Sequence, residues 1–284
     1  WSPVLYSVHR EQRDALLAEG WNSIEVGSEM VVDPRMWKTT GKKWQDVRTA
    51  INKAKRDGIT DVQSTFLESP LEVREQIEDI SEEWAQLKAL PEMKFTLGGV
   101  EELRDPRVRL LYAVDADGRV LGVTSWLPTW RDGRVIGWTL DFMRHRTDSP
   151  NGIMEFLIAR MAERLRDEGA ADPERAAEFM SLSAAPLAGM NPERDNAGEG
   201  GAPAGEGTQV LQHALQIVAD WMEPAYGFHS LFNFKRKFQP TEAPVYVCYP
   251  DPAALPQIGL AVVRAYVPSV TPAEVAGMLS TLRS

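Results

Sequence analysis

The chain has 284 residues and a net charge of -10, and cysteine occurs once, at Cys248. The acidic balance argues against a general binder of nucleic acid or anionic membranes, and a single cysteine excludes an internal disulfide framework and suits a reducing compartment. Hydrophobic residues make up 43% of the sequence and charged residues 25%, as in globular proteins that bury a sizeable core. The chain begins at Trp1, inside an expected strand, and we interpret it as part of a longer protein.

The first third of the chain is expected to alternate strands with helices. Hydrophobic patterning and turn residues predict strands over 3–8 and 22–32 and helices over 11–20, 39–58 and 71–88. Apolar residues at helical spacing support the second helix, and a Ser-Pro pair precedes the third. The lysines and arginines of the second helix would lie on its faces away from the core.

This second helix lies in a strongly basic segment. Between Arg35 and Gly58 there are eight basic and two acidic residues, a balance of +6, so the rest of the chain carries -16. Such an asymmetry predicts a local surface for binding anions. The alternative is a solvated helix face without a ligand.

The pattern then changes to that of a sheet. Three apolar runs over 107–143, separated by Ala-Asp-Gly and Arg-Asp-Gly turns, predict a meander of three antiparallel strands. The elements expected after it are a helix over 153–167, a strand over 178–187, a flexible Gly-rich loop over 189–207, helices over 208–222 and 230–238, a strand over 243–250 and two short C-terminal helices. This order predicts an α/β (α+β) fold, a mixed sheet flanked by helices, and it is the element order of the GCN5-related acyltransferase fold.

One strand-to-helix junction, with the sequence DFMRHRTDSPNGIM over 141–154, collects many charged residues. A plain connection needs only a turn and a helix cap, so these charges point to a site. Several common chemistries are excluded, because the chain has no G-x-S-x-G elbow, no Walker A motif and no H-E-x-x-H pair. The four histidines lack ligand spacing, and we expect no metal site.

Four blocks then occur in a fixed order between about residues 3 and 250. They are TTGKKWQDVRTAINKAKRDG, DFMRHRTDSPNGIMEFL, SLSAAPLAG and LFNFKRKFQPTEAPVYVCY. Together they resemble the catalytic C-terminal domain of the bacterial phosphatidylglycerol lysyltransferases, the multiple peptide resistance factors. One feature departs from the family pattern, because the linker after the third block is longer and richer in glycine. Acyl-CoA enzymes of the GCN5-related fold usually carry a Gly-rich pyrophosphate loop at the junction, and RHRTDSPNG is not one, which argues against coenzyme A as the donor.

The resemblance implies transfer of Lys or Ala from an aminoacyl-tRNA to the glycerol hydroxyl of phosphatidylglycerol or a related membrane lipid. It implies no cofactor, a role in surface charge and resistance to cationic peptides, an N-terminal membrane region outside this chain and a place on the cytoplasmic face of the cell membrane. It also implies two related acyltransferase-like lobes, with residues 1–34 as a remnant of the first, 35–250 as the catalytic lobe and 251–284 as a helical extension.

Asp141 and Arg144 fall on family positions for which the resemblance implies an essential role. Asp141 is the candidate general base or orienting group for the attacking hydroxyl, and Arg144 is the candidate for binding phosphate or stabilising the oxyanion. The alternative is a buried ion pair that only fixes the junction. Residues three apart face opposite sides of a regular strand, so both reach one site only if the strand ends or bulges between them.

The expected substrate-binding residues form three groups. Phosphates of the tRNA would contact the basic helix, Arg146 and a C-terminal basic run, while free backbone N–H groups at the start of the helix after the junction would bind a phosphate or an oxyanion. The last two residues of the strand after that helix would line the amino-acid pocket. The full set is Lys42, Lys43, Arg48, Asn52, Lys53, Arg56, Arg146, Asn151, Gly152, Lys235, Arg236 and Lys237, with Pro186 and Leu187 in the pocket. An ordinary helix cap at Asn151 and Gly152, and a core position for the pocket pair, remain as alternatives.

Two other functions stay open on the sequence alone. One is an acyltransferase with another acceptor, such as diacylglycerol or a peptide amine. The other is a non-catalytic module that binds lipid or tRNA, which the combination of Asp141, Arg144 and the basic helix disfavours.

Overall fold

A computed structural model describes residues 3–86, 98–186 and 228–266. The strands are β1 (Leu5–Val8), β2 (Asn22–Val32), β3 (Thr60–Ser64), β4 (Arg109–Val114), β5 (Val120–Arg131), β6 (Arg134–His145), β7 (Phe179–Pro186) and β8 (Thr241–Tyr249). The helices are α1 (Arg10–Ala18), α2 (Gln45–Arg56), α3 (Leu71–Gln86), α4 (Ile153–Ala171), α7 (Phe228–Arg236) and α8 (Leu255–Tyr266). Within these residues no helix is both long enough and apolar enough to cross a membrane.

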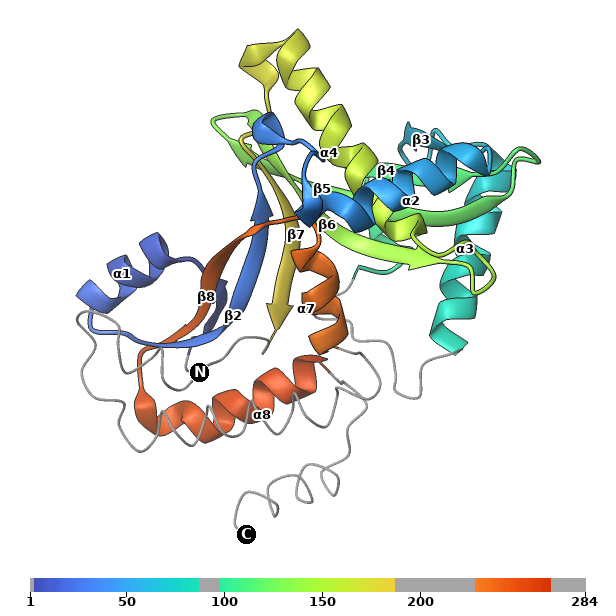
Figure 1. Ribbon diagram of the computed structural model, residues 1–284. Coiled ribbons are helices and arrows are strands. Elements are labelled where there is room, and N and C mark those ends of the chain that lie inside the picture. The colour runs from blue at the N-terminus through green and yellow to red at the C-terminus, as the bar shows by residue number, and fades with distance from the viewer. Residues whose placement is uncertain (1–2, 87–97, 187–227, 267–284) are drawn as a thin grey trace.

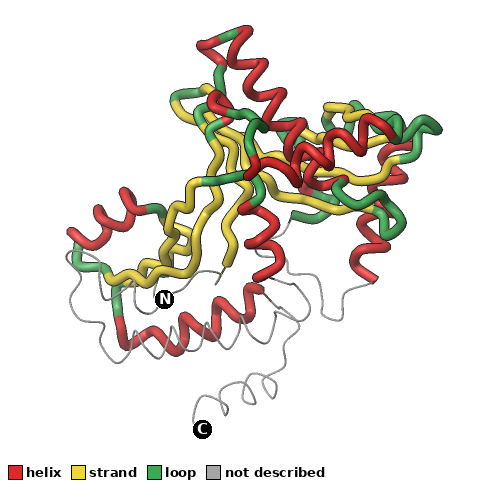
Figure 2. Tube along the Cα trace, viewed as in Figure 1, coloured by secondary structure: helices red, strands yellow, loops and turns green. Residues whose placement is uncertain are grey.

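The described strands form one mixed sheet in the order β1-β8-β2-β7-β6-β5-β4-β3 (Figures 1 and 2). The predicted meander is confirmed, since β4, β5 and β6 pair antiparallel in sequence. The pairing of β6 with β7 is parallel, and α4 makes the crossover between them. The mixed α/β fold is therefore as the sequence predicts.

Helices cover both faces of the sheet (Figure 1). α2 and α4 pack on one face, where Val47 and the buried side of α4, including Leu157 and Met161, meet strand residues such as Leu111 and Leu140. α3 packs on the other face of β3 to β6 through a second cluster. α8 covers the part of the sheet formed by β2 and β8. α2 and α4 thus share one buried face, while α3 and α8 each pack their apolar side on a cluster of their own.

Some elements differ from those predicted. Residues 39–58 are not one helix, because Gly41 has φ +92°, a 3-10 turn (η2, Lys42–Trp44) follows, and α2 begins only at Gln45. β3 was not predicted, since it is a five-residue edge strand of mostly polar sequence. α4 continues past 167 to Ala171. Leu187, the loop over 189–207, the helix over 208–222 and a second C-terminal helix lie outside the described residues.

Within residues 3–34, β1 and β2 belong to the same sheet as the later strands that the structure describes. β2 lies between β7 and β8 and pairs antiparallel with both, and β1 forms the edge beside β8. The division into a first lobe, a catalytic lobe and an extension stays a prediction.

Candidate functional site

The candidate site lies where β6 and β7 separate. Their parallel register holds three residue pairs and ends at Thr139 and Ser181, although β6 runs on to His145 and β7 to Pro186. Figure 1 shows the two strands diverging beyond the paired segment. The second half of β6, with the junction that follows it, therefore has no backbone pairing with β7.

A β-bulge marks the same level of β6. Between the pairs Thr124–Met143 and Trp126–Leu140, β5 advances by two residues while β6 advances by three. The hydroxyl of Ser125 on β5 accepts a hydrogen bond of 3.0 Å from the backbone N–H of Phe142, inside the bulge. An extra residue reverses the alternation of side chains, and this is the condition under which two residues three apart share a face.

Asp141 lies inside this bulge and contacts the segment that leads to the 3-10 turn η3 (Glu102–Arg104). The backbone N–H of Gly98 donates to its carboxylate, and a Cβ atom added to Gly98 would lie 1.8 Å from Asp141 Oδ2. Burial raises the pKa of Asp141, the negative charge of Glu102 raises it further, and the Gly98 hydrogen bond acts in the opposite direction. Glu102 itself accepts 2.8 Å from the N–H of Gly99. The backbone N–H of Gly98 thus holds the carboxylate, and its raised pKa makes it a stronger base than an exposed aspartate.

Arg144 lies on the α3 face and is only 4% exposed. One guanidinium nitrogen donates to the carbonyl oxygen of Ser81 at 3.2 Å and also to the Ser81 hydroxyl. The guanidinium lies 4.2 Å from the ring centroid of Trp84 and 4.5 Å from that of Phe142. Hydrogen bonds and aromatic faces both stabilise a buried cation, so α3 fixes a positive charge on the face of the sheet that Asp141 also reaches.

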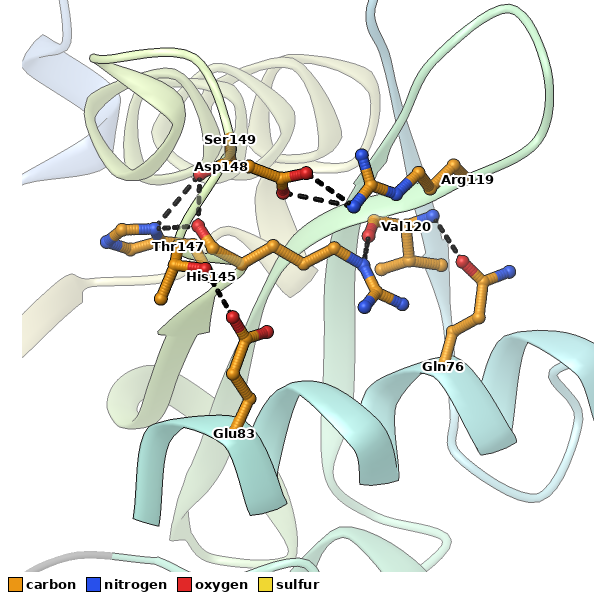
Figure 3. A network of polar contacts seen from close by, with 9 residues as sticks. Gln76, Glu83, Arg119, Val120, His145, Thr147, Asp148 and Ser149 are labelled. Carbon is orange, nitrogen blue, oxygen red and sulfur yellow. Dashed lines mark hydrogen bonds and ion pairs between the residues drawn. The ribbon is translucent and has the colours of Figure 1, made fainter. Parts of the chain in front are cut away.

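The remaining polar side chains of the junction connect it to its neighbours (Figure 3). The contacts are Arg146 Nε to the carbonyl of Val120 (2.9 Å), Thr147 to Glu83, Asp148 to Arg119 (2.8 Å) and His145 Nδ1 to the hydroxyl of Ser149 (3.0 Å). The N–H of Val120 in turn donates to Gln76 on α3. Much of the charge at 145–148 therefore fastens the junction to α3 and to the turn between β4 and β5.

The basic segment divides into exposed and internally bonded residues. Lys42 and Lys43 on η2, and Asn52 and Arg56 on α2, are exposed. Two further residues have local partners: Arg48 donates to the carbonyl oxygens of Thr39 (2.6 Å) and Gly41 (2.5 Å), and Lys53 pairs with Asp57 at 2.5 Å. Arg48 thus holds the loop that precedes η2.

The start of α4 packs directly against α2. Gly152 precedes the helix with φ +94°, and a Cβ atom there would lie 3.0 Å from the Cβ of Ala50. Glycine fits both the left-handed backbone and the close approach, while Asn151 beside it is exposed. The structure therefore brings the basic helix and the first turn of α4 together.

The C-terminal basic run does not form one exposed patch, because Lys235 is only 3% exposed. Its Nζ donates to the carbonyl oxygens of Ser183 (3.3 Å) and Ala184 (3.1 Å). Burial lowers the pKa of Lys235 to about 7, and the negative charge of Glu29 acts in the opposite direction. Lys235 therefore presents no surface charge to a phosphate, which differs from the expectation.

The neighbours of Lys235 have other positions. Arg236 is exposed and lies 3.6 Å from Glu242, and Lys237 bonds Glu155 on α4 at 2.8 Å. Pro186 ends β7 opposite Gly27 of β2.

Comparison with known proteins identifies the family of this chain. The family model described as phosphatidylglycerol lysyltransferase, C-terminal, matches residues 1–249. The chain belongs to this family. The expectation drawn from the four sequence blocks is thereby confirmed.

The relatives of this chain are longer proteins. An uncharacterized protein of Corynebacterium glutamicum is 38% identical over 267 residues, which are 94% of this chain and 31% of the relative. The lysylphosphatidylglycerol biosynthesis bifunctional protein LysX of Mycobacterium ulcerans is 27% identical over 267 residues, 93% of this chain and 22% of LysX. The chain thus spans less than a third of the length of these curated relatives.

Two solved structures have the same fold. The structure of L-PGS from Bacillus licheniformis superposes with a TM-score of 0.69 at 22% identity, over 93% of this chain and 72% of that one. The C-terminal domain of a putative lysylphosphatidylglycerol synthetase from Agrobacterium fabrum gives 0.67 at 21% identity, with the same coverage.

Several residues around Asp141 and Arg144 were not predicted. They are Ser81, Trp84, Gly98 and Glu102. The Gly-Gly pair at 98–99 is the one local signal among them, since adjacent glycines mark a close backbone approach. The others sit in ordinary helical or turn sequence, and only the packing of α3 and η3 on the sheet brings them to the site.

Proposed function

We propose that this domain transfers an aminoacyl group, Lys or Ala, from an aminoacyl-tRNA to the glycerol hydroxyl of phosphatidylglycerol or a related membrane lipid. The observation that carries the proposal is the β6 bulge, which brings Asp141 and the buried cation of Arg144 to one face of the sheet. Membership of the family supports the reaction class. A lipid acceptor together with a tRNA donor would put the reaction at the cytoplasmic face of the cell membrane, where an N-terminal membrane region would hold the domain.

The reaction needs no external activation, because an aminoacyl ester is already reactive. Asp141 accepts the proton of the lipid hydroxyl as its oxygen attacks the ester carbonyl. The tetrahedral oxyanion forms near the positive charge of Arg144. Its collapse breaks the bond to the tRNA ribose oxygen, which takes the proton and leaves. The raised pKa of Asp141 strengthens it as a base relative to an exposed aspartate.

Backbone phosphates of the tRNA would contact the exposed part of the basic segment, with Lys42, Lys43 and Arg56 as point charges and Asn52 as a neutral donor. Arg48, Lys53, Arg146, Arg236 and Lys237 already have partners in the chain and would contribute through the local field. The start of α4 at Asn151 and Gly152 adds backbone N–H groups beside this surface. Pro186 and Leu187 would line the pocket for the amino acid.

The paired change K42E and K43E should weaken tRNA binding and make it less dependent on salt. Each lost phosphate contact lowers the slope of log affinity against log salt by about 1, so the double variant should lose about 2. The control is R166E with R175E, which alters the net charge equally on two residues paired to neighbouring aspartates, one near the end of α4 and one in the turn that follows it. Fluorescence anisotropy with labelled tRNA across a salt series measures both slopes. An equal loss in both variants, or a loss independent of salt, would contradict the assignment.

The transfer itself is tested with the membrane-bound protein and a set of radiolabelled aminoacyl-tRNAs. Lipids are extracted after incubation with vesicles that contain phosphatidylglycerol, and the label is assigned to an amino acid and a lipid. We expect labelled lysyl- or alanyl-phosphatidylglycerol. Label in a diacylglycerol ester or a peptide would show that the acceptor is not phosphatidylglycerol. No label from any charged tRNA would favour a non-catalytic module that binds lipid or tRNA.

A further inference from the structure

Ser183 on β7 has a backbone conformation that is unusual for its residue type. Its φ is +65°, in the left-handed region, although it lies within a strand. β7 bulges at this point, because between the pairs Val31–Ser181 and Glu29–Ala184 β2 advances by two residues while β7 advances by three. A non-glycine residue in this region costs of order 1 kcal/mol or more and persists only where its surroundings hold it.

Three hydrogen bonds hold Ser183 in place. Its N–H donates to the hydroxyl of Ser181 at 3.0 Å, and its carbonyl oxygen accepts from Nζ of Lys235 at 3.3 Å. Its own hydroxyl donates across to β6, to the carbonyl oxygen of Leu140. That contact lies just beyond the last backbone pair, Thr139 with Ser181. The side chain of Ser183 thus bonds β6 one residue beyond the last backbone pair, where the backbone of β7 has already separated from β6.

The two side chains that hydrogen-bond the backbone of Ser183 are themselves buried. Lys235 is 3% exposed and Ser181 is fully buried. The hydroxyl of Ser181 also donates to the carboxylate of Glu29, and this carboxylate lies 3.0 Å from Nε2 of His9. Buried polar groups keep a fixed geometry when all of them are bonded. This network therefore fixes the position of the Ser183 hydroxyl.

We propose that Ser183 is a positioning residue for the aminoacyl transfer, which holds the Leu140 carbonyl and thereby the adjacent Asp141. This inference rests on the proposed function for the identity of the reaction, while the contact between Ser183 and Leu140 does not depend on it. The two strands that separate at the site each have a bulge at the same level, β6 at Asp141 and β7 at Ser183. The hydrogen bond from the Ser183 hydroxyl to the Leu140 carbonyl oxygen connects the two bulges. Loss of this bond frees β6 to shift, and Asp141 then leaves its place against Gly98.

Two substitutions separate the hydroxyl from the backbone conformation. Ser183→Gly keeps the left-handed backbone without strain but removes the donor. Ser183→Asn keeps a donor on a short side chain, and asparagine tolerates this backbone region better than other non-glycine residues. We expect kcat to fall about 10- to 100-fold in Ser183→Gly, with the KM for aminoacyl-tRNA nearly unchanged. Ser183→Asn should recover most of the loss.

A second measurement does not depend on activity. The carboxyl pKa of Asp141 is followed by carbon-13 NMR in the wild-type protein and both variants. In Ser183→Gly the pKa should fall toward that of an ordinary aspartate, because the carboxyl leaves its buried place beside Glu102, and Ser183→Asn should restore it. An unchanged pKa in Ser183→Gly would overturn the inference, as would a parallel loss of kcat, KM and melting temperature in both variants. If the wild-type protein transfers nothing, the proposed function fails, and the titration alone decides the role of Ser183.

Discussion

Replacing Asp141 by Asn is expected to lower the rate of transfer by about 100- to 10,000-fold, the range for loss of a general base. Asparagine has the same shape and its oxygen still accepts from the N–H of Gly98, so the fold should be retained. It cannot take the proton of the attacking hydroxyl. Single-turnover transfer from a preformed aminoacyl-tRNA measures the chemical step directly. A variant that reacts at the wild-type rate would remove Asp141 from the mechanism.

The pH dependence of the same reaction gives an independent check of this role. A base works above its pKa, so transfer is lost as pH falls through the pKa of Asp141. Burial and Glu102 raise this pKa, and the acidic limb should therefore lie above the range of an exposed aspartate. Glu102→Gln removes the negative charge but keeps an acceptor for Gly99, and it should move the limb to lower pH. A limb that does not move would assign it to another group.

Replacing Gly98 by Ala should cost about 100-fold in transfer, through displacement of the same carboxyl. The added Cβ would lie 1.8 Å from Asp141 Oδ2 and 2.6 Å from its Cγ. Atoms cannot approach so closely, so the short side chain of Asp141 has to rotate away from the Gly98 N–H. The loss should appear in kcat, because the base is present but misplaced.

Gly99→Ala is the matched control for this change. A Cβ at Gly99 would lie 3.1 Å from Oε2 of Glu102, an exposed side chain that can move aside. Measured at a pH above the acidic limb, transfer should stay within about twofold of wild type, since a movement of Glu102 changes only the pKa of Asp141 and leaves its carboxyl in place. Equal losses in the two alanine variants, with equal falls in melting temperature, would point to the loop backbone and away from Asp141.

The sequence predicts those parts of the fold that depend on local pattern. The meander from β4 to β6 follows from alternating apolar residues and two Asp-Gly turns, and the junction before α4 is marked by its charges and by Pro-Asn-Gly. The geometric condition for Asp141 and Arg144 to share a face could be stated, but the bulge that meets it could not be located. It arises from the register between β5 and β6, which no local pattern records.

Burial was the other property that local pattern could not supply. The run Lys235, Arg236 and Lys237 has the composition of a surface patch. Successive residues of a helix point about 100° apart, so the end of α7 directs Lys235 into the protein and Arg236 to solvent. Gly98 likewise meets Asp141 only through tertiary packing.

The position of β2 between β7 and β8 has a consequence for how the molecule folds. β2, near the beginning of the chain, lies between two strands from much later in the sequence. The sheet is therefore complete only after contacts between distant parts of the sequence have formed. Such contacts slow folding. Until β2 inserts, β7 and β8 each present an open edge with unpaired amides, and open edges invite association with other chains. A version of the protein shortened to begin after β2 would keep Asp141, Arg144 and the basic helix, but it would lack β1 as well as β2. β7 would then have a permanently open edge and β8 would lose both of its described strand partners, so the first defect expected is aggregation.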